Sequence, residues 1–127
     1  MGAIQIGKFI NAELLKVLPN ISINPILEPE NADTVDSYIV YRRISLTPDY
    51  TKDGIVGNDI VEEINIMSKA YTTGVDIAQL VRDCFELKTG SYSNTITIYQ
   101  CELLPVPEES TDGVIYIQSL QFEFLTN

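Results

Sequence analysis

The chain shows two spacings of apolar residues, one typical of helices and one typical of strands. Residues 6–18 carry apolar side chains at the 3.6-residue spacing of an amphipathic helix, and Pro19 follows as a stop signal. Residues 77–85 repeat that spacing, with Thr72 or Thr73 as the expected N-terminal cap. The sequence therefore predicts two amphipathic helices.

Four other stretches alternate apolar and polar residues, which is the pattern of strands with one buried face. They cover residues 37–46, 60–67, 95–104 and 114–125. Residues 21–27 predict a further short strand, which Pro25 would confine to a sheet edge. The apolar phase shifts inside the last stretch, so either a β-bulge near Gln118 or burial on both faces is expected.

The order of these elements, helix, strands, helix, strands, is typical of an α+β fold. We predict a mainly antiparallel four- to five-stranded sheet with two helices packed on one face. The 127 residues, 45% of them apolar, suit a single domain over residues 1–127. Residues 47–59 hold turn-forming residues and are predicted to be a loop, either a functional one or a hairpin tip.

The predicted strands carry more apolar side chains than the helix-facing side of the sheet can use. A contiguous apolar patch on the open side would mark a surface for association between copies. The candidate interface residues are Ile39, Tyr41, Tyr99, Ile115 and Ile117. The alternatives are that the strand phases are the reverse of this assignment, or that a loop covers the patch.

The formal net charge is −10, from 18 acidic and 8 basic residues. Binding to nucleic acid through its phosphates needs a basic surface, so neither nucleic acid nor an anionic membrane is an expected partner. The apolar runs are also shorter than a membrane-spanning helix requires. The acidity has two explanations, which are solubility through self-repulsion and a surface that repels or mimics DNA.

The sequence nominates no catalytic, cofactor-binding or metal-binding residue. It has no histidine, which removes the commonest general base, and it has no glycine-rich phosphate loop. Residues 49–54 only half resemble a calcium loop, because Ile60 stands where the bidentate glutamate is needed. Cys84 and Cys101 are expected to be thiols of the core. Arg42 is in phase with the presumed core residues of its strand, and we expect it to pair with an acid such as Glu62.

Three segments resemble the tail-completion proteins of long-tailed phages and prophages, a group that includes head-to-tail joining and tail-terminator proteins. The residues that carry the resemblance are Tyr38, Val40, Tyr41 and Arg43; Ala70, Tyr71, Ile77, Ala78, Leu80, Val81 and Arg82; and Gln121, Phe122, Glu123 and Phe124. The order of the elements around them also matches, so the resemblance extends over nearly the whole chain.

The resemblance implies a non-enzymatic α+β subunit that forms a homohexameric ring around the DNA channel. The ring would cap the tail tube and join it to the head connector. Its partners would be further copies of the chain, the tail-tube protein and the connector proteins. It would assemble in the host cytoplasm and end in the tail or neck of the virion.

Two other functions remain open on the sequence alone. One is a small acidic binding module, such as a DNA-mimicking inhibitor or an antitoxin-like partner. The other is an enzyme with a carboxylate-based site, which predicts acidic side chains that converge in a pocket with at least one raised pKa.

Overall fold

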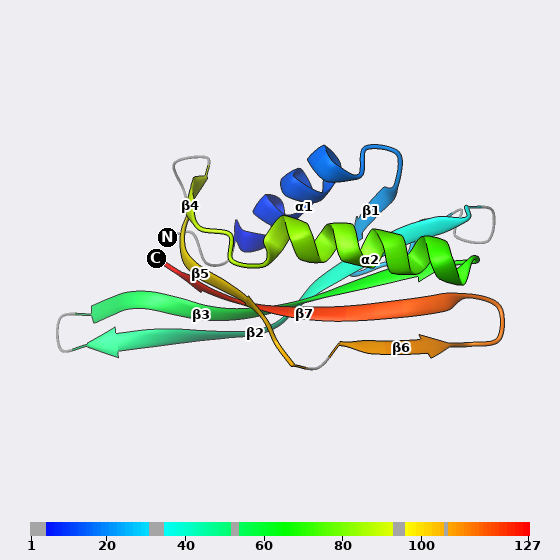
Figure 1. Ribbon diagram of the computed structural model, residues 1–127. Helices are drawn as coiled ribbons and strands as arrows, with labels where there is room; N and C mark the ends of the chain where they lie inside the picture. The colour runs from blue at the N-terminus through cyan, green and yellow to red at the C-terminus, as the bar shows by residue number, and fades with distance from the viewer. Residues whose placement is uncertain (1–4, 31–34, 52–53, 93–95, 106) are drawn as a thin grey trace.

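The computed structural model describes residues 5–30, 35–51, 54–92, 96–105 and 107–127, and the side chains within these outside residues 49–56 (Figure 1). Two helices and seven strands follow one another along the described chain. They are α1 (Ile6–Val17), β1 (Ser22–Pro25), β2 (Ser37–Thr51), β3 (Gly54–Ser68), α2 (Tyr71–Phe85), β4 (Gly90–Tyr92), β5 (Ile96–Leu103), β6 (Glu108–Thr111) and β7 (Tyr116–Thr126).

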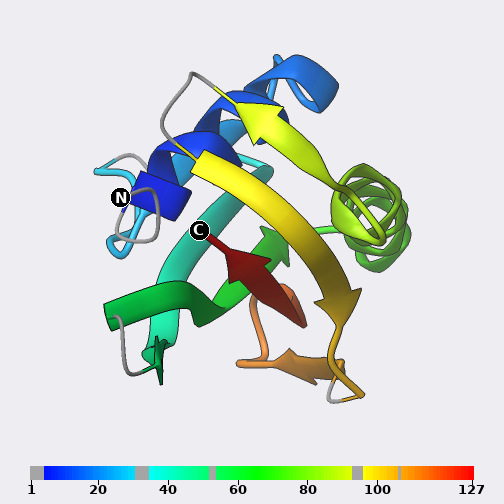
Figure 2. The same cartoon turned by 90° about the vertical axis from the view of Figure 1, so that its left-hand side faces the viewer.

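All seven strands form one sheet in the order β1-β2-β3-β7-β5-β4, with β6 also paired to β7. Both helices lie on one side of this sheet, which curls toward them (Figures 1 and 2). The α+β prediction is therefore confirmed. The sheet is larger than the four or five strands expected. It is also mixed, because β1 pairs with β2 in parallel, whereas the other pairs are antiparallel.

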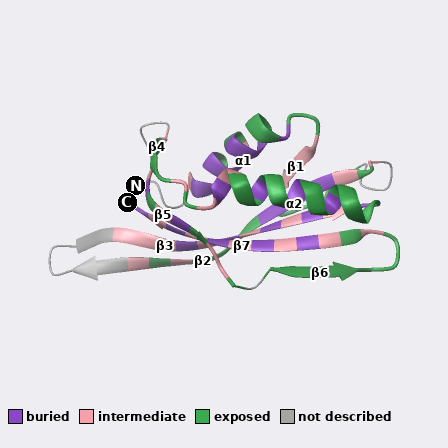
Figure 3. Ribbon diagram, in the orientation of Figure 1, coloured by how far each residue is buried: buried purple, intermediate pink, exposed green. Residues whose placement is uncertain are grey.

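The core lies between the two helices and one face of the sheet. Alternate residues of β7 from Gln118 to Thr126 are buried, and the intervening residues are half-buried, as the banding in Figure 3 shows. Phe9 and Phe85 from the helices meet Phe124 of β7, with ring centroids 6.3 and 6.2 Å from it in edge-to-face geometry. Each buried aromatic side chain contributes roughly 2–3 kcal/mol, so this cluster fastens both helices to the centre of the sheet.

The apolar phase of β2 is the reverse of the one expected. Ile39 and Tyr41 face the helices and are 0% and 6% exposed, so their assignment to the open face is wrong. The reason is a register shift between Arg43 and Ser45, which leaves Ile44 as an extra residue against β3. One extra residue inverts the side-chain alternation, so extrapolation from Leu46 back across this bulge gives the wrong face.

The segment 47–59 is not a loop in the described structure. β2 and β3 continue as a two-stranded arm, and their pairing extends to Thr51 opposite Gly54. Pro48 and Gly57, which suggested a loop, lie within the paired strands opposite Asn58 and Asp49. Turn-forming residues are tolerated here because the arm extends beyond the helices (Figure 1).

The bulge expected near Gln118 is also absent. The pairing of β7 with β3 runs without a register shift from Tyr116 opposite Ser68 to Thr126 opposite Asn58. The change of apolar phase instead reflects Ile117, which lies on the face opposite Gln118 and is half-buried, and Ile115, which precedes the strand.

The sequence predicts Thr72 or Thr73 as the N-terminal cap of α2 and Gly90 as the stop signal after it, and none of these residues has that role. The N-cap of α2 is Ala70, so Thr72 and Thr73 lie inside the helix, and the Ala70 N–H donates to Ser68 Oγ at 3.2 Å. After the helix, Leu87 adopts φ 64°, the left-handed conformation that glycine usually supplies at this place. Gly90 belongs to β4 instead.

Gly57 provides a test of how closely β3 and β7 pack at the base of the arm. A Cβ atom at this position would lie 2.9 Å from the Thr126 carbonyl oxygen. We expect Gly57→Ala to lower the free energy of unfolding by about 1–3 kcal/mol, because backbone must move to relieve the clash. Urea unfolding measures this change.

Gly7→Ala is the matched control. Its Cβ would meet only the Tyr41 ring at 3.8 Å, an ordinary contact, and the alanine favours the helix by up to about 1 kcal/mol. Equal stability losses in the two variants would contradict the assignment of close packing to Gly57.

Candidate functional site

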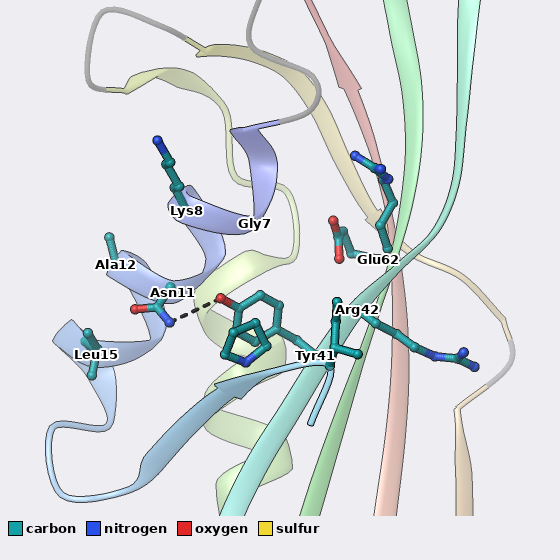
Figure 4. Close-up of a pocket in the computed structure, with 11 residues that line it drawn as sticks. Gly7, Lys8, Asn11, Ala12, Leu15, Tyr41, Arg42 and Glu62 are labelled. Atoms are coloured by element: carbon teal, nitrogen blue, oxygen red, sulfur yellow. Dashed lines mark hydrogen bonds between the residues drawn. The ribbon is translucent and has the colours of Figure 1, made fainter. Parts of the chain in front are cut away.

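A groove of 690 Å³ lies between α1 and the margin of the sheet (Figure 4). Successive turns of α1 line one side of the groove. The end of β1 and the middle of β2 line the other side. The lining residues are Gly7, Lys8, Asn11, Ala12, Leu15, Pro25, Ile26, Tyr41, Arg42, Arg43 and Glu62. The volume falls in the range of ligand and peptide sites. One wall of the groove is apolar and consists of Ala12, Leu15, Pro25 and Ile26.

The groove exists because β1 is much shorter than β2. The last contact of the β1 segment with β2 is the Ile26 N–H, which donates to the Tyr41 carbonyl at 2.9 Å. Ile26 then adopts φ 67° and turns the chain away. Beyond Tyr41, no strand in the described part of the chain pairs with the outer edge of β2.

Glu62 is a buried carboxylate at the floor of the groove. It is 2% exposed, and its Oε2 has no hydrogen-bond partner among the described residues. Burial raises the pKa of Glu62 to about 7, and the nearby Arg43 opposes this shift only in part. Sequence reasoning missed this site, because Glu62 occupies a position where the alternation of Ile60 and Ile64 predicts an apolar residue.

Arg42 does not pair with Glu62 as expected. The two residues lie on opposite faces of the sheet, since Arg43 is the cross-strand neighbour of Glu62 and Arg42 that of Glu63. Arg42 Nε lies 3.2 Å from Glu63 Oε1 on the open face. Hydrogen bonds from Asn65, Arg42 and Gln121 outweigh partial burial, the largest opposing effect, and hold the pKa of Glu63 below its usual value.

Two cations of the groove form no close ion pair, although the charge of Arg43 acts on the neighbouring Glu62. Lys8 and Arg43 form no ion pair within the described ranges, whereas Lys16, Arg42, Arg82 and Lys88 each do. In a chain with net charge −10, unpaired cations in one groove are unexpected on composition alone. The groove therefore presents an apolar wall, two unpaired cations and one buried acid.

A second buried acid has a structural role instead. Glu13 of α1 accepts a hydrogen bond from Lys88 at 2.7 Å and another from Lys16 at 3.2 Å. Burial alone would raise its pKa, but these two lysines outweigh that effect and lower it. The Glu13–Lys88 pair ties α1 to the segment that follows α2.

The strand β6 is the second surface that the sequence did not reveal. All four of its residues are exposed, and its outer edge pairs with no strand in the described ranges. Glu109 Oε2 accepts hydrogen bonds from Tyr71 Oη and Gln118 Nε2, both at 2.6 Å, which fix β6 beside the start of α2. Asp112 accepts from the Val114 and Ile115 N–H groups at 2.8 Å and shapes the turn into β7.

The predicted interface residues do not gather in one patch. Ile39 and Tyr41 are in the core. Tyr99 is 60% exposed at a bulge of β5, beside a hollow that the end of β7 also lines. Ile115 and Ile117 lie at the other end of β7, next to β6. Their role as a subunit interface stays a prediction.

The other candidate chemistry lies in the core or is not found in the described residues. Cys84 and Cys101 are free thiols, half-buried and buried, and burial raises the pKa of Cys101 to about 12. Among the described residues, no three His, Cys, Asp or Glu side chains are grouped as metal ligands. No helix in the described ranges is long and apolar enough to span a bilayer. The half-match to a calcium loop falls on residues whose side chains lie outside the description.

Comparison with known proteins gives a likeness in fold alone. The chain matches no family model, and no curated protein is similar to it in sequence. A chain in the solved structure "Virion of native gene transfer agent (GTA) particle" has a similar fold, with a TM-score of 0.72 and 12% sequence identity. The match covers 92% of this chain and 90% of that chain.

Glu62 generates a pH-dependent prediction. Because its folded-state pKa is about 7 against an ordinary 4.5, the folded protein retains a proton there that the unfolded chain has lost. The contribution to stability is complete below about pH 4.5 and is lost as the pH rises through 7. We expect Glu62→Gln to raise the free energy of unfolding by as much as about 3 kcal/mol near pH 8, with little effect near pH 4.5.

Urea unfolding of both proteins at several pH values measures this difference. Glu63→Gln is the control, because the lowered pKa of Glu63 stabilises the fold above pH 4.5 and its loss gives the opposite sign. A stability difference between the wild type and Glu62→Gln that does not change with pH would rule out a raised pKa.

Proposed function

We propose that this chain is a non-enzymatic structural component of a phage-like virion. The observation that carries the proposal is the shared fold with a chain of the gene transfer agent virion over 92% of its length. The segments that resemble tail-completion proteins supply independent support. They occupy β2, α2 and β7, which all contribute residues to the core, and β2 also lines the groove.

Within the virion, the proposed role is to complete the tail and join it to the head connector as a homohexameric ring around the DNA channel. The chain would bind further copies of itself, the tail-tube protein and the connector proteins. Assembly would take place in the host cytoplasm, before the ring becomes part of the tail or neck. The net charge of −10 suits a channel that DNA must pass without adhering.

The architecture supports assembly in a ring. A closed ring needs two different surfaces on each subunit that complement one another. The described structure has two such surfaces on opposite margins of the sheet, the basic groove next to α1 and the acidic strand β6. Among the described residues, Glu62 Oε2 in the groove has no hydrogen-bond partner, and the outer backbone edge of β6 pairs with no strand.

Solution mass and electron microscopy test this proposal. We expect the purified chain to form closed six-fold rings, seen by negative staining and by light scattering over a wide concentration range. If isolated subunits stay monomeric, we expect purified tail tubes without this protein to recruit it as a terminal ring. A stable two-fold dimer would contradict the ring and favour the acidic binding module.

A further inference from the structure

Two strands leave backbone edges unpaired at opposite margins of the sheet. The outer edge of β2 is free from Arg42 onward, and the outer edge of β6 is free throughout, within the described residues. Free edges present rows of N–H and C=O groups that readily pair with another strand. The outer edges of β1, of β4 and of β5 beyond Ile98 are also unpaired in the described chain. The short strands β1 and β4 carry no charged residue, and the free part of β5 carries Glu102 alone.

The two free edges carry opposite charges. The only adjacent basic pair of the chain, Arg42-Arg43, stands at the start of the free edge of β2. The pair Glu108-Glu109 occupies the first half of β6. Like charges opposite one another destabilise a strand pair and opposite charges stabilise it. Pairing of β6 with β6, or of β2 with β2, is therefore disfavoured, and pairing of β6 with β2 is favoured.

The charges also match face by face. Arg43 and Glu109 lie on the helix side of the sheet, since their cross-strand neighbours are Glu62 and Gln118. Arg42 and Glu108 lie on the open side. If the sheet of one copy continues into that of another, each face therefore brings one acid toward one arginine. On the helix side, Lys8 of the groove adds a second unpaired cation.

The strand directions permit this contact between copies of the same orientation. The three pairs β2 with β3, β3 with β7, and β7 with β6 are all antiparallel, so β6 runs opposite to β2. Copies related by a simple rotation therefore present β6 antiparallel to the neighbouring β2. A ring related by rotation alone meets this condition at every contact.

The two edges are offset along the strands. Glu109 is level with Gln118 of β7, whereas Arg43 is level with Glu62, which lies opposite Phe122. Four residues of a strand correspond to about 13 Å. Successive copies would be staggered by this amount along the strands, which tilts the strands relative to the ring axis, as in closed barrels.

We infer that β6 of one copy adds to the free edge of β2 in the next copy, with Glu108 and Glu109 directed toward Arg42, Arg43 and Lys8. The inference rests on the proposed ring and names the contact that closes it. The partner that binds at the free edge of β2, next to the groove, is thus a second copy of this chain. The contact is head-to-tail, because each copy uses β2 on one side and β6 on the other.

Complementary charge reversals test the contact. In the Glu108→Lys/Glu109→Lys variant, both edges are basic, and in the Arg42→Glu/Arg43→Glu variant both are acidic. We expect neither variant to form rings alone, while an equimolar mixture forms rings of alternating subunits. Light scattering and negative-stain images give the readout, and circular dichroism shows that each variant is folded.

Asp76→Lys/Asp83→Lys is the matched control, since it changes the net charge by the same amount on the exposed side of α2. It is expected to assemble as the wild type does. Arg43→Glu adds an acid beside the buried Glu62, so Arg42→Glu alone serves as a second acidic variant in which Arg43 and Glu62 are unchanged. With that variant, the mixture is expected to regain part of the assembly.

The outcomes separate the contact from the ring itself. Two results would overturn the β6–β2 contact alone. In one, both charge-reversal variants form rings by themselves as the wild type does; in the other, their mixture stays dissociated while the control variant assembles. A wild-type chain that neither forms rings nor joins tail tubes would overturn the contact and the proposed function together.

Discussion

The pairing of β3 with β7 is the constraint on which the rest of the structure depends. Both strands are central, and both present their alternate side chains to the two helices. Their register places Ile64 beside Leu120 and Ile60 beside Phe124, so the apolar rows of the two strands are adjacent. A slip of one residue between the two strands would turn one of the two rows away from the helices and remove half of the surface that they cover.

Glu62 is the one charged group in this apolar surface. Its row on β3 otherwise consists of isoleucines up to Ser68, and an unpaired buried polar group costs about 1–3 kcal/mol. A chain under selection for stability alone would replace it with an apolar residue. Its place among the residues that line the groove, beside Arg43, connects that cost with the margin of the sheet where the subunit contact is proposed.

Much of the fold could be predicted from the sequence, because both helices and the central strand β3 carry unambiguous periods, whereas the apolar phase of the central strand β7 shifts at its start. The α+β class and the helix-facing row of β3 follow from that pattern. The reversed phase of Ile39 and Tyr41 shows where it fails, since the bulge at Ile44 leaves no signal in composition. The pairing in the arm could not be predicted because Pro48 and Gly57 usually mark turns. The strand β6 could not be predicted because it contains no apolar residue.

The candidate site was predictable only in its parts. The sequence shows the basic pair Arg42-Arg43 and the acidic pair Glu108-Glu109, but their meaning depends on which strand edges remain free. That property arises from the short length of β1 and from the pairing of β6 with only the first part of β7. Neither is encoded by local propensity, so charge complementarity between the edges appears only in the folded chain.

The central position of β7 also governs when the chain is able to fold during its synthesis. This strand is the last in chain order, yet it joins β3 to β5 and β6 and supplies Phe122 and Phe124 to the core. The ribosome must therefore release residues up to Thr126 before the core closes. Until then β2 and β3 are able to pair with each other, but the two helices lack the part of the core that β7 supplies. Such late, non-local closure is slow and exposes apolar surface in the meantime. A nascent chain paused before β7 would thus be a substrate for chaperones and proteases, and only complete subunits would become available for assembly.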